Sequence, residues 1–237
     1  MTKLLATTIL GSIAATALVV AGPLAAKPEA KAKATARASS WDQKLSRTPA
    51  GNHLIGNPAA KVRLVEFMSY TCPHCAHYSQ EAKTALMGGL VRQGKVVVEV
   101  RPFFRNIVDV SASLLALCGP DSKFVGNHHA IMAAQSNWLK NPPEGAQDRW
   151  NKLEFPAKMK AVAQDMGLYT LMTTRGYSPA QLDQCLANRT VADKLAAQTN
   201  DAIQAGVSGT PSFMINGKLQ EAHEWATLKP VLSAAAR

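Results

Sequence analysis

Two cysteines separated by two residues, Cys72 and Cys75, stand where the residue pattern of the chain changes. Residues 62–68 are nearly continuous in apolar side chains, as in a strand covered on both faces, and a helical pattern follows the first cysteine. Proline favours the first position of a helix, because the N–H group that it lacks would have no partner there. Pro73 therefore places Cys72 at the N-cap and Cys75 at the third helical position, where the two side chains can meet in a disulfide.

The N-cap position predicts a reactive thiol at Cys72. A side chain there faces the unpaired amides of His74 and Cys75 and the positive end of the helix dipole. Both features stabilise the thiolate, which is the nucleophile in disulfide exchange, and the side chain of His74 adds a further donor. A stabilised thiolate also makes the disulfide a stronger oxidant. We expect Cys72 to be the nucleophile, Cys75 the resolving thiol and His74 a stabiliser of the thiolate.

Two other interpretations of this motif stay open at this point. Cys72 and Cys75 could form a structural disulfide, or they could bind a metal together with His74 and His77. The metal site is less favoured, because Pro73 and the helix geometry are explained without a metal. We predict no metal and no cofactor other than the redox-active disulfide itself.

A single carboxylate, Glu66, lies inside the apolar strand, six residues before Cys72. Burial of a carboxylate is costly and raises its pKa. A buried Glu66 could therefore pass protons to and from Cys75 during exchange. The alternative is that Glu66 points to solvent at an edge of the sheet.

The segment that contains Thr210 and Pro211 is expected to form the other wall of the site. Pro211 enters a predicted strand, where proline removes a ladder donor and marks an edge or a special turn. A cis bond before Pro211 would leave the backbone of Thr210 free to pair with an extended peptide, although the sequence alone leaves the isomer open. Both residues are candidate substrate-binding residues.

The elements that must position these residues are those of a small α/β domain. The order strand, helix, strand, with a long crossover, allows the two strands to be parallel. Strand signals return near the end of the chain, where Asn216 and Gly217 predict a hairpin turn. The predicted strands cover residues 53–55, 62–68, 95–101 and 211–215, and the predicted helices of this domain cover residues 73–93 and 222–236.

Between these two parts the pattern is almost wholly helical. We therefore expect an α/β domain formed by residues 41–107 and 206–237, interrupted by an all-helical insertion over residues 108–205. The predicted helices of the insertion cover residues 109–118, 122–139, 154–175, 179–187 and 190–205.

The start of the chain has the pattern of an export signal. A lysine at position 3 precedes an apolar run, and small residues follow a helix break at Gly22 and Pro23. We predict a signal peptide over residues 1–26, a flexible tether over residues 27–40 and a periplasmic location. An uncleaved membrane anchor is the alternative, because the apolar run is nearly long enough to span a bilayer.

The chain has four cysteines, and an even number in an oxidising compartment favours disulfides. Cys118 and Cys185 both fall in predicted helices of the insertion, and we expect them to form a structural disulfide. Free buried thiols or a second redox centre are the alternatives. His53, His77 and His223 are expected to be surface or capping residues.

The composition argues against some partners. The formal net charge is +10, but aromatic residues make up only 6% of the chain and no arginine-rich patch interleaves with them. We therefore expect no nucleic acid partner, and the excess charge is interpreted as a solvated basic surface.

Two segments, VEFMSYTCPHC and GVSGTPSFMING, resemble the DsbA family of thioredoxin-fold dithiol oxidases. The resemblance covers roughly residues 50–107 and 206–236. It implies a thioredoxin-like domain, with a mixed central sheet flanked by helices, that carries a large helical insertion. It further implies that Glu66 is a buried acid and that Thr210 precedes a cis-proline, Pro211.

The resemblance implies oxidation of reduced exported proteins, followed by reoxidation by a membrane quinone-linked partner of DsbB type. A disulfide isomerase or reductase on the same fold is the first alternative, and a copper or zinc binding module is the second. Residues 27–52 are too few for a dimerisation domain of the kind found in DsbC-type isomerases. We predict a monomer; the alternative is a trimer formed through a short helical segment.

Overall fold

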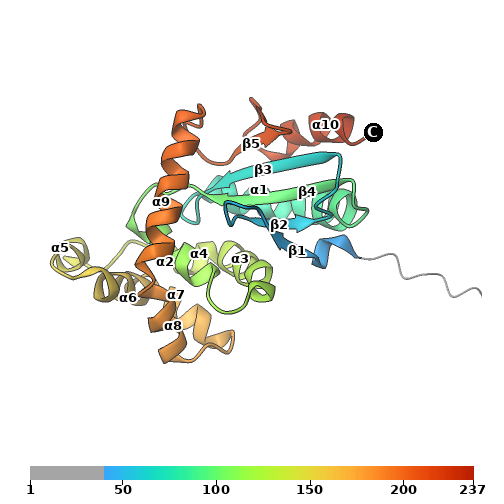
Figure 1. Ribbon diagram of the computed structural model, residues 1–237. Coiled ribbons are helices and arrows are strands. Elements are labelled where there is room, and N and C mark those ends of the chain that lie inside the picture. The colour runs from blue at the N-terminus through green and yellow to red at the C-terminus, as the bar shows by residue number, and fades with distance from the viewer. Residues whose placement is uncertain (1–39) are drawn as a thin grey trace, which may run out of the picture. The chain divides into compact units, whose positions relative to one another are not determined.

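The computed structural model describes residues 40–237 and contains a six-stranded mixed sheet with the strand order β1-β2-β4-β3-β5-β6 (Figure 1). β3 and β4 are parallel, and the other neighbouring pairs are antiparallel. The strands are β1 (Leu45–Arg47), β2 (His53–Gly56), β3 (Val62–Met68), β4 (Val96–Pro102), β5 (Ser212–Ile215) and β6 (Lys218–Leu219). The predicted leader, and the predicted tether up to residue 39, lie outside the described residues. Within residues 40–237 no helix has both the length and the apolar character needed to cross a membrane.

The two central strands are β3 and β4, and both are almost entirely buried. They are parallel because the connection between them is long enough to cross over the sheet, first as α1 (Pro73–Ala82) and then as a π-helical segment (η2, Lys83–Val91). Gly94, with φ +73°, ends this connection, because glycine adopts this left-handed conformation without a steric penalty. The sequence predicts the helix but not its change to π-helical winding.

Helices cover both faces of the sheet, as Figure 1 shows. α1, η2 and α10 (Trp225–Ala235) pack on one face, where the larger core cluster includes Leu64 and Met68 of β3. A smaller cluster on the other face joins Val65 and Phe67 of β3 to Ala202 of α9. Alternate residues of β3 therefore enter two different cores, which explains its nearly continuous apolar sequence.

The segment between β4 and β5 is helical, which agrees with the predicted fold class. Two predicted helices are divided: the first at Ala134, and the second at Gly167, whose φ is +73°. β1 and α5 are short elements that the sequence pattern does not predict. The helices of this segment are α2 (Ile107–Ala116), α3 (Phe124–Ala133), α4 (Gln135–Trp138), α5 (Ala146–Asn151), α6 (Phe155–Asp165), α7 (Leu168–Thr174), α8 (Pro179–Leu186) and α9 (Arg189–Gln204), and the 3-10 turns are η1 (Trp41–Gln43) and η3 (Asp121–Lys123).

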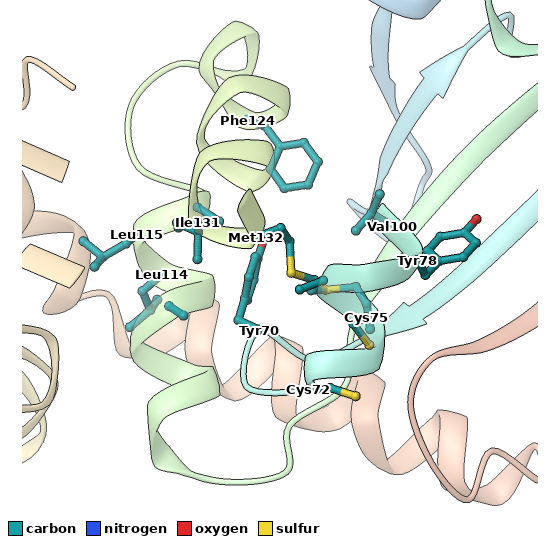
Figure 2. Close-up of a cluster of buried hydrophobic side chains, with 14 of the residues drawn as sticks. Tyr70, Cys72, Cys75, Tyr78, Val100, Leu114, Leu115, Phe124, Ile131 and Met132 are labelled. Atoms are coloured by element: carbon teal, nitrogen blue, oxygen red, sulfur yellow. The ribbon is translucent and has the colours of Figure 1, made fainter. Parts of the chain in front are cut away.

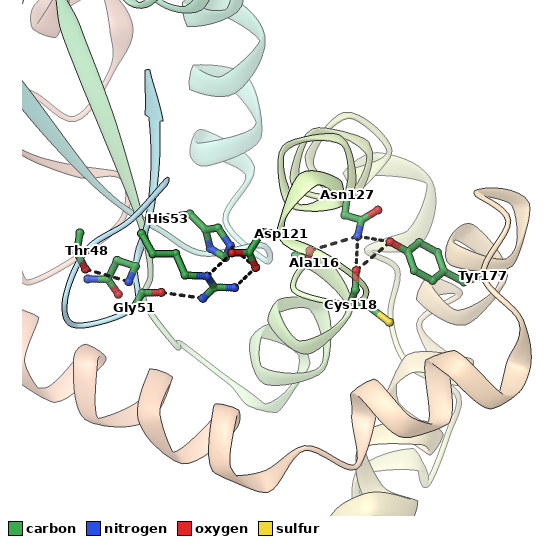
Figure 3. A network of polar contacts seen from close by, with 10 residues as sticks. Thr48, Gly51, His53, Ala116, Cys118, Asp121, Asn127 and Tyr177 are labelled. Carbon is green, nitrogen blue, oxygen red and sulfur yellow. Dashed lines mark hydrogen bonds and ion pairs between the residues drawn. The ribbon is translucent and has the colours of Figure 1, made fainter. Parts of the chain in front are cut away.

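A disulfide joins Cys118, just after α2, to Cys185 in α8. The carbonyl group of Cys118 also accepts hydrogen bonds from the amide of Asn127 and from the hydroxyl of Tyr177 (Figure 3). These contacts connect the two halves of the insertion.

Removal of this bridge should lower stability without changing the reactive pair. The two cysteines are 67 residues apart, and a loop of that length corresponds to about 4 kcal/mol in the chain-entropy account of disulfides. A Cys118→Ser/Cys185→Ser variant should lose roughly that much free energy of unfolding, measured with denaturant. Mass spectrometry of a non-reduced digest should find peptides containing Cys118 and Cys185 linked, and alkylated thiols at both positions would contradict the assignment.

Candidate active site

The helix α1 starts where the sequence predicts, with Cys72 as its N-cap residue and Pro73 in its first turn. The carbonyl oxygen of Cys72 accepts hydrogen bonds from the amides of Cys75 (3.1 Å) and Ala76 (3.3 Å), which begin the helix. Cys72 and Cys75 are free thiols with 3% and 0% of their surfaces exposed. Figure 2 shows both sulfur atoms on the same side of the start of α1.

The environment of Cys72 favours the thiolate. The hydrogen bond from the Cys75 thiol has the largest effect, and with the backbone amides of Cys75 and His74 it lowers the pKa of Cys72 to about 5, although burial acts in the opposite direction. In the thiol form the Sγ atom of Cys72 donates a hydrogen bond to the carbonyl oxygen of Thr210 (3.1 Å), so it makes no capping hydrogen bond. Cys72 can therefore act as a nucleophile at neutral pH.

Cys75 has the opposite character. Burial raises its pKa far above the usual thiol range, and its hydrogen bond to Cys72 adds to this. Cys75 therefore stays protonated when Cys72 is ionised. The two thiols of the motif thus differ in character: the pKa of Cys72 is lowered and that of Cys75 is raised.

The structure places the His74 side chain on the surface, beside a groove that Thr210 and Pro211 also line. Its backbone amide is among the groups that lower the pKa of Cys72. The contribution expected from its imidazole group stays a prediction.

Glu66 lies in β3, between β4 and β5, and only 6% of its surface is exposed. It faces the side of the sheet that α1 covers, so it does not point to solvent at a sheet edge. Burial raises its pKa to about 8, and its charge contributes to the raised pKa of Cys75. A cavity of about 20 Å³, the space of about one water molecule, lies beside Glu66, Tyr78 and His129.

The segment before β5 lies against the cysteines. The peptide bond between Thr210 and Pro211 is cis, and the carbonyl group of Thr210 faces Cys72. The carbonyl oxygen of Pro211 accepts a hydrogen bond from Nδ1 of His223 (2.8 Å). The exposed His223 is therefore a neighbour of the site, and its position in the sequence carries no signal of this contact.

A groove of about 500 Å³ lies between the start of α1 and the segment that precedes β5. It is open to solvent on one side and has room for part of an extended peptide. Its lining residues are His74, His77, Tyr78, Gly209, Thr210, Pro211, Glu221, His223, Glu224 and Thr227.

One predicted feature, the surface position of His53, differs from what the structure shows. His53 is 3% exposed and stacks on Phe124 with ring centres 3.8 Å apart, so its prediction as a surface or capping residue is wrong. Its burial results from the pairing of β2 with β4 and from the contact with α3, which a local pattern does not reveal. In the part of the chain that the structure describes, no three His, Cys, Asp or Glu side chains are grouped to hold a metal ion.

Two buried polar residues of the insertion, Asp109 and Gln135, also contact the active-site loop, Ser69 to Cys72, which connects β3 to α1. The sequence gives no sign that they belong to the site. Each stands in a helical segment far from the cysteines in the sequence, with no motif around it.

Comparison with known proteins gives a consistent assignment. The family model for thioredoxin matches residues 48–234. A protein of Rickettsia typhi assigned as a protein-disulfide oxidoreductase is 31% identical over 166 residues, which are 69% of this chain and 54% of that protein. The corresponding protein of Rickettsia conorii is 32% identical over 69% of this chain and 53% of its own length. The chain thus spans about half the length of these relatives.

Two solved structures are also similar. The protein-disulfide isomerase from Novosphingobium aromaticivorans is 46% identical, with a TM-score of 0.75 over 78% of this chain and 97% of that one. Wolbachia pipientis alpha-DsbA1 shares the fold, with a TM-score of 0.60 and 19% identity over 83% of this chain and 96% of that one. The family match over residues 48–234, with the paired cysteines at the end of a strand of a thioredoxin-like sheet, shows that the chain belongs to the thioredoxin family.

Proposed function

We propose that this protein is an exported dithiol oxidase that forms disulfides in reduced proteins. The observation that carries the proposal is the difference between the two thiols: Cys72 has its pKa lowered to about 5, whereas Cys75 stays protonated. A thiol of low pKa is a good leaving group, so a disulfide that contains it is readily reduced by a client.

The reaction begins with the Cys72–Cys75 disulfide. A client thiolate attacks the sulfur of Cys72, forms a mixed disulfide and releases Cys75 as a thiolate, which takes up a proton. A second client thiolate then attacks the client sulfur of the mixed disulfide and releases Cys72 as the stabilised thiolate. The client dithiol loses two electrons and becomes a disulfide, and the cysteine pair gains them.

Glu66 is suited to supply the proton that Cys75 takes up. Because burial raises its pKa to about 8, much of Glu66 is protonated at neutral pH, and it lies on the face of the sheet that α1 covers. Thr210 and Pro211 are proposed to hold the extended client chain along the groove beside Cys72.

The remaining parts of the proposal come from the sequence. The leader pattern supports a periplasmic location, and the family resemblance supports reoxidation by a membrane quinone-linked partner of DsbB type. We propose a monomer that acts on reduced exported proteins, without nucleic acid and without a cofactor beyond its own disulfide.

Disulfide isomerisation is a second candidate function, because the solved structure that is 46% identical is named a protein-disulfide isomerase. An isomerase must begin from the reduced pair, and in that case the Cys72 thiolate attacks a disulfide of the client. The reduction potential of the Cys72–Cys75 pair separates the two functions.

The test is the equilibrium of the pair with glutathione, combined with thermal melts of both redox states. An oxidase should have a reduction potential well above that of thioredoxin, which is about −270 mV. Its reduced form should melt at a higher temperature than its oxidised form. The pKa of Cys72 is lower in the folded state than in the unfolded state, so its contribution to reduced-state stability should grow as the pH rises from about 5 towards 9 and be lost as the pH falls through 5. A thioredoxin-like potential with an oxidised form that melts higher would replace the oxidase with an enzyme that works from the reduced pair, an isomerase or a reductase.

A His74→Leu variant belongs in the same experiment. If the imidazole group stabilises the thiolate, this variant should raise the pKa of Cys72 and weaken the oxidant, with little change in the melting of the oxidised form. If the pKa of Cys72 is unchanged in this variant, the backbone amide of residue 74, and not the imidazole group, accounts for the stabilisation of the thiolate by this residue.

A further inference from the structure

The loop from Ser69 to Cys72, which connects β3 to the reactive helix α1, is held by two side chains of the helical insertion. The first is Asp109 in the first turn of α2, which is 1% exposed. Its carboxylate accepts hydrogen bonds from the hydroxyl of Ser69 (2.8 Å) and from the amide of Thr71 (2.9 Å). These contacts fix the odd-numbered residues of the loop.

The second side chain is Gln135, the first residue of α4, which is 5% exposed. Its Nε2 group donates hydrogen bonds to the carbonyl oxygens of Tyr70 (2.8 Å) and Cys72 (2.9 Å). The even-numbered residues of the loop are thus held by a different helix. The insertion therefore forms hydrogen bonds to every residue of the loop that carries Cys72.

The contact between Gln135 and Cys72 involves the peptide group that starts α1. The same carbonyl oxygen accepts from the amides of Cys75 and Ala76, which form the first turn of the helix. The orientation of this peptide group determines where the Cys72 side chain lies relative to the Cys75 thiol and the free amides. A donor that holds this peptide group therefore acts on the reactivity of Cys72 through geometry.

We propose that Gln135 is a positioning residue for the exchange reaction, through which the helical insertion, with the help of Asp109, holds Cys72 in its reactive geometry. The proposal rests on the proposed function only in that Cys72 is the exchanging thiol. It applies equally to an oxidase and to an isomerase. It assigns the insertion a part in the chemistry besides any role in client binding.

The competing explanation is that Gln135 is simply a buried amide that satisfies two carbonyl groups. Asn127 of α3 is a matched control for that explanation. It is 0% exposed, and its Nδ2 group donates to the carbonyl groups of Ala116 and Cys118 and to the hydroxyl of Tyr177, away from the loop (Figure 3). Loss of either amide removes buried hydrogen bonds from the insertion, but only Gln135 contacts the loop.

The experiment titrates the reduced full-length protein by thiolate absorbance against pH, for wild type, Gln135→Leu, Gln135→Glu and Asn127→Leu. Because the pKa of Cys75 is raised far above the usual range, the first transition reports on Cys72. We expect Gln135→Leu to raise the pKa of Cys72 by about 0.5 to 1 unit, in line with the net worth of one hydrogen bond. Gln135→Glu should raise it too, because a glutamate in either protonation state has fewer donors.

Asn127→Leu should lower the melting temperature about as much as Gln135→Leu does, because each variant loses buried hydrogen bonds. It should leave the pKa of Cys72 within about 0.2 unit of the wild-type value, well below the shift that corresponds to the loss of one hydrogen bond. The proposal is overturned if the Gln135 variants titrate like wild type, or if Asn127→Leu shifts the pKa equally. If Gln135→Leu does not fold, the nearly isosteric Gln135→Glu decides the question. The titration needs no client and no oxidant, so its failure is distinguishable from a failure of the proposed oxidase function, which the reduction potential tests.

Discussion

Replacement of Cys75 by serine should trap the protein in covalent complexes with its clients. In the variant, Cys72 still attacks client disulfides as a thiolate, because the serine hydroxyl can donate in place of the Cys75 thiol and the amides of His74 and position 75 are kept. The resolving thiol is absent, so the mixed disulfide persists. Non-reducing gels and mass spectrometry of exported proteins should show adducts linked through Cys72, and these adducts should disappear on reduction.

Cys72→Ser is the matched variant and should reduce exchange to background. Cys75 is 0% exposed and its pKa is raised, so it cannot replace Cys72 as the attacking thiol. A variant without Cys72 should therefore form no adducts. Adducts that accumulate on Cys72→Ser, but not on Cys75→Ser, would reverse the assignment of the two roles.

Replacement of Glu66 by glutamine should stabilise the protein strongly at alkaline pH. The pKa of Glu66 is raised from 4.5 to about 8 in the folded state, so folding favours the protonated acid. The folded state binds more protons than the unfolded state between these two values, and wild-type stability therefore falls as the pH rises through this range. The loss corresponds to roughly 5 kcal/mol above pH 8, and it should be absent from Glu66→Gln.

The measurement is the free energy of unfolding of the oxidised protein as a function of pH, because Cys72 does not titrate in the disulfide. The two proteins should be equally stable at about pH 4 and diverge above it, with the variant more stable. Parallel pH profiles would mean that Glu66 does not titrate with a raised pKa.

Glu99 provides a control on the neighbouring strand β4. It is 0% exposed, but it forms ion pairs with Arg63 and Arg101 and accepts a hydrogen bond from Asn52. Burial acts to raise the pKa of Glu99, but the hydrogen bonds and the arginines outweigh it, and the pKa is lowered. Glu99→Gln should therefore destabilise the protein at neutral pH, and the difference should shrink as the pH falls below the usual carboxylate pKa. Two buried carboxylates should thus respond to pH in opposite directions.

The sequence by itself predicts the elements whose signals are local. Pro73 marks the start of α1 with Cys72 as its N-cap, because the proline restriction acts on its own residue and its neighbours. Asn216 (φ 49°) and Gly217 (φ 83°) form the predicted turn between β5 and β6, because these residue types tolerate positive φ. The strand β3 and the helical character of the insertion also follow from patterns within short windows.

Tertiary structure alone decides which distant groups meet. Thr210 is 138 residues from Cys72, yet its carbonyl group lies 3.1 Å from the sulfur, because β5 pairs with β3 at the centre of the sheet. Gln135 and Asp109 reach the active-site loop only because α2 and α4 pack beside it. The raised pKa of Glu66 likewise depends on the full cover of β3 by other elements, since a carboxylate in an apolar strand could also face solvent at an edge. Local backbone preferences act over a few residues, whereas burial and long-range hydrogen bonds arise only when the whole chain has packed, and the reactivity of the site depends on both.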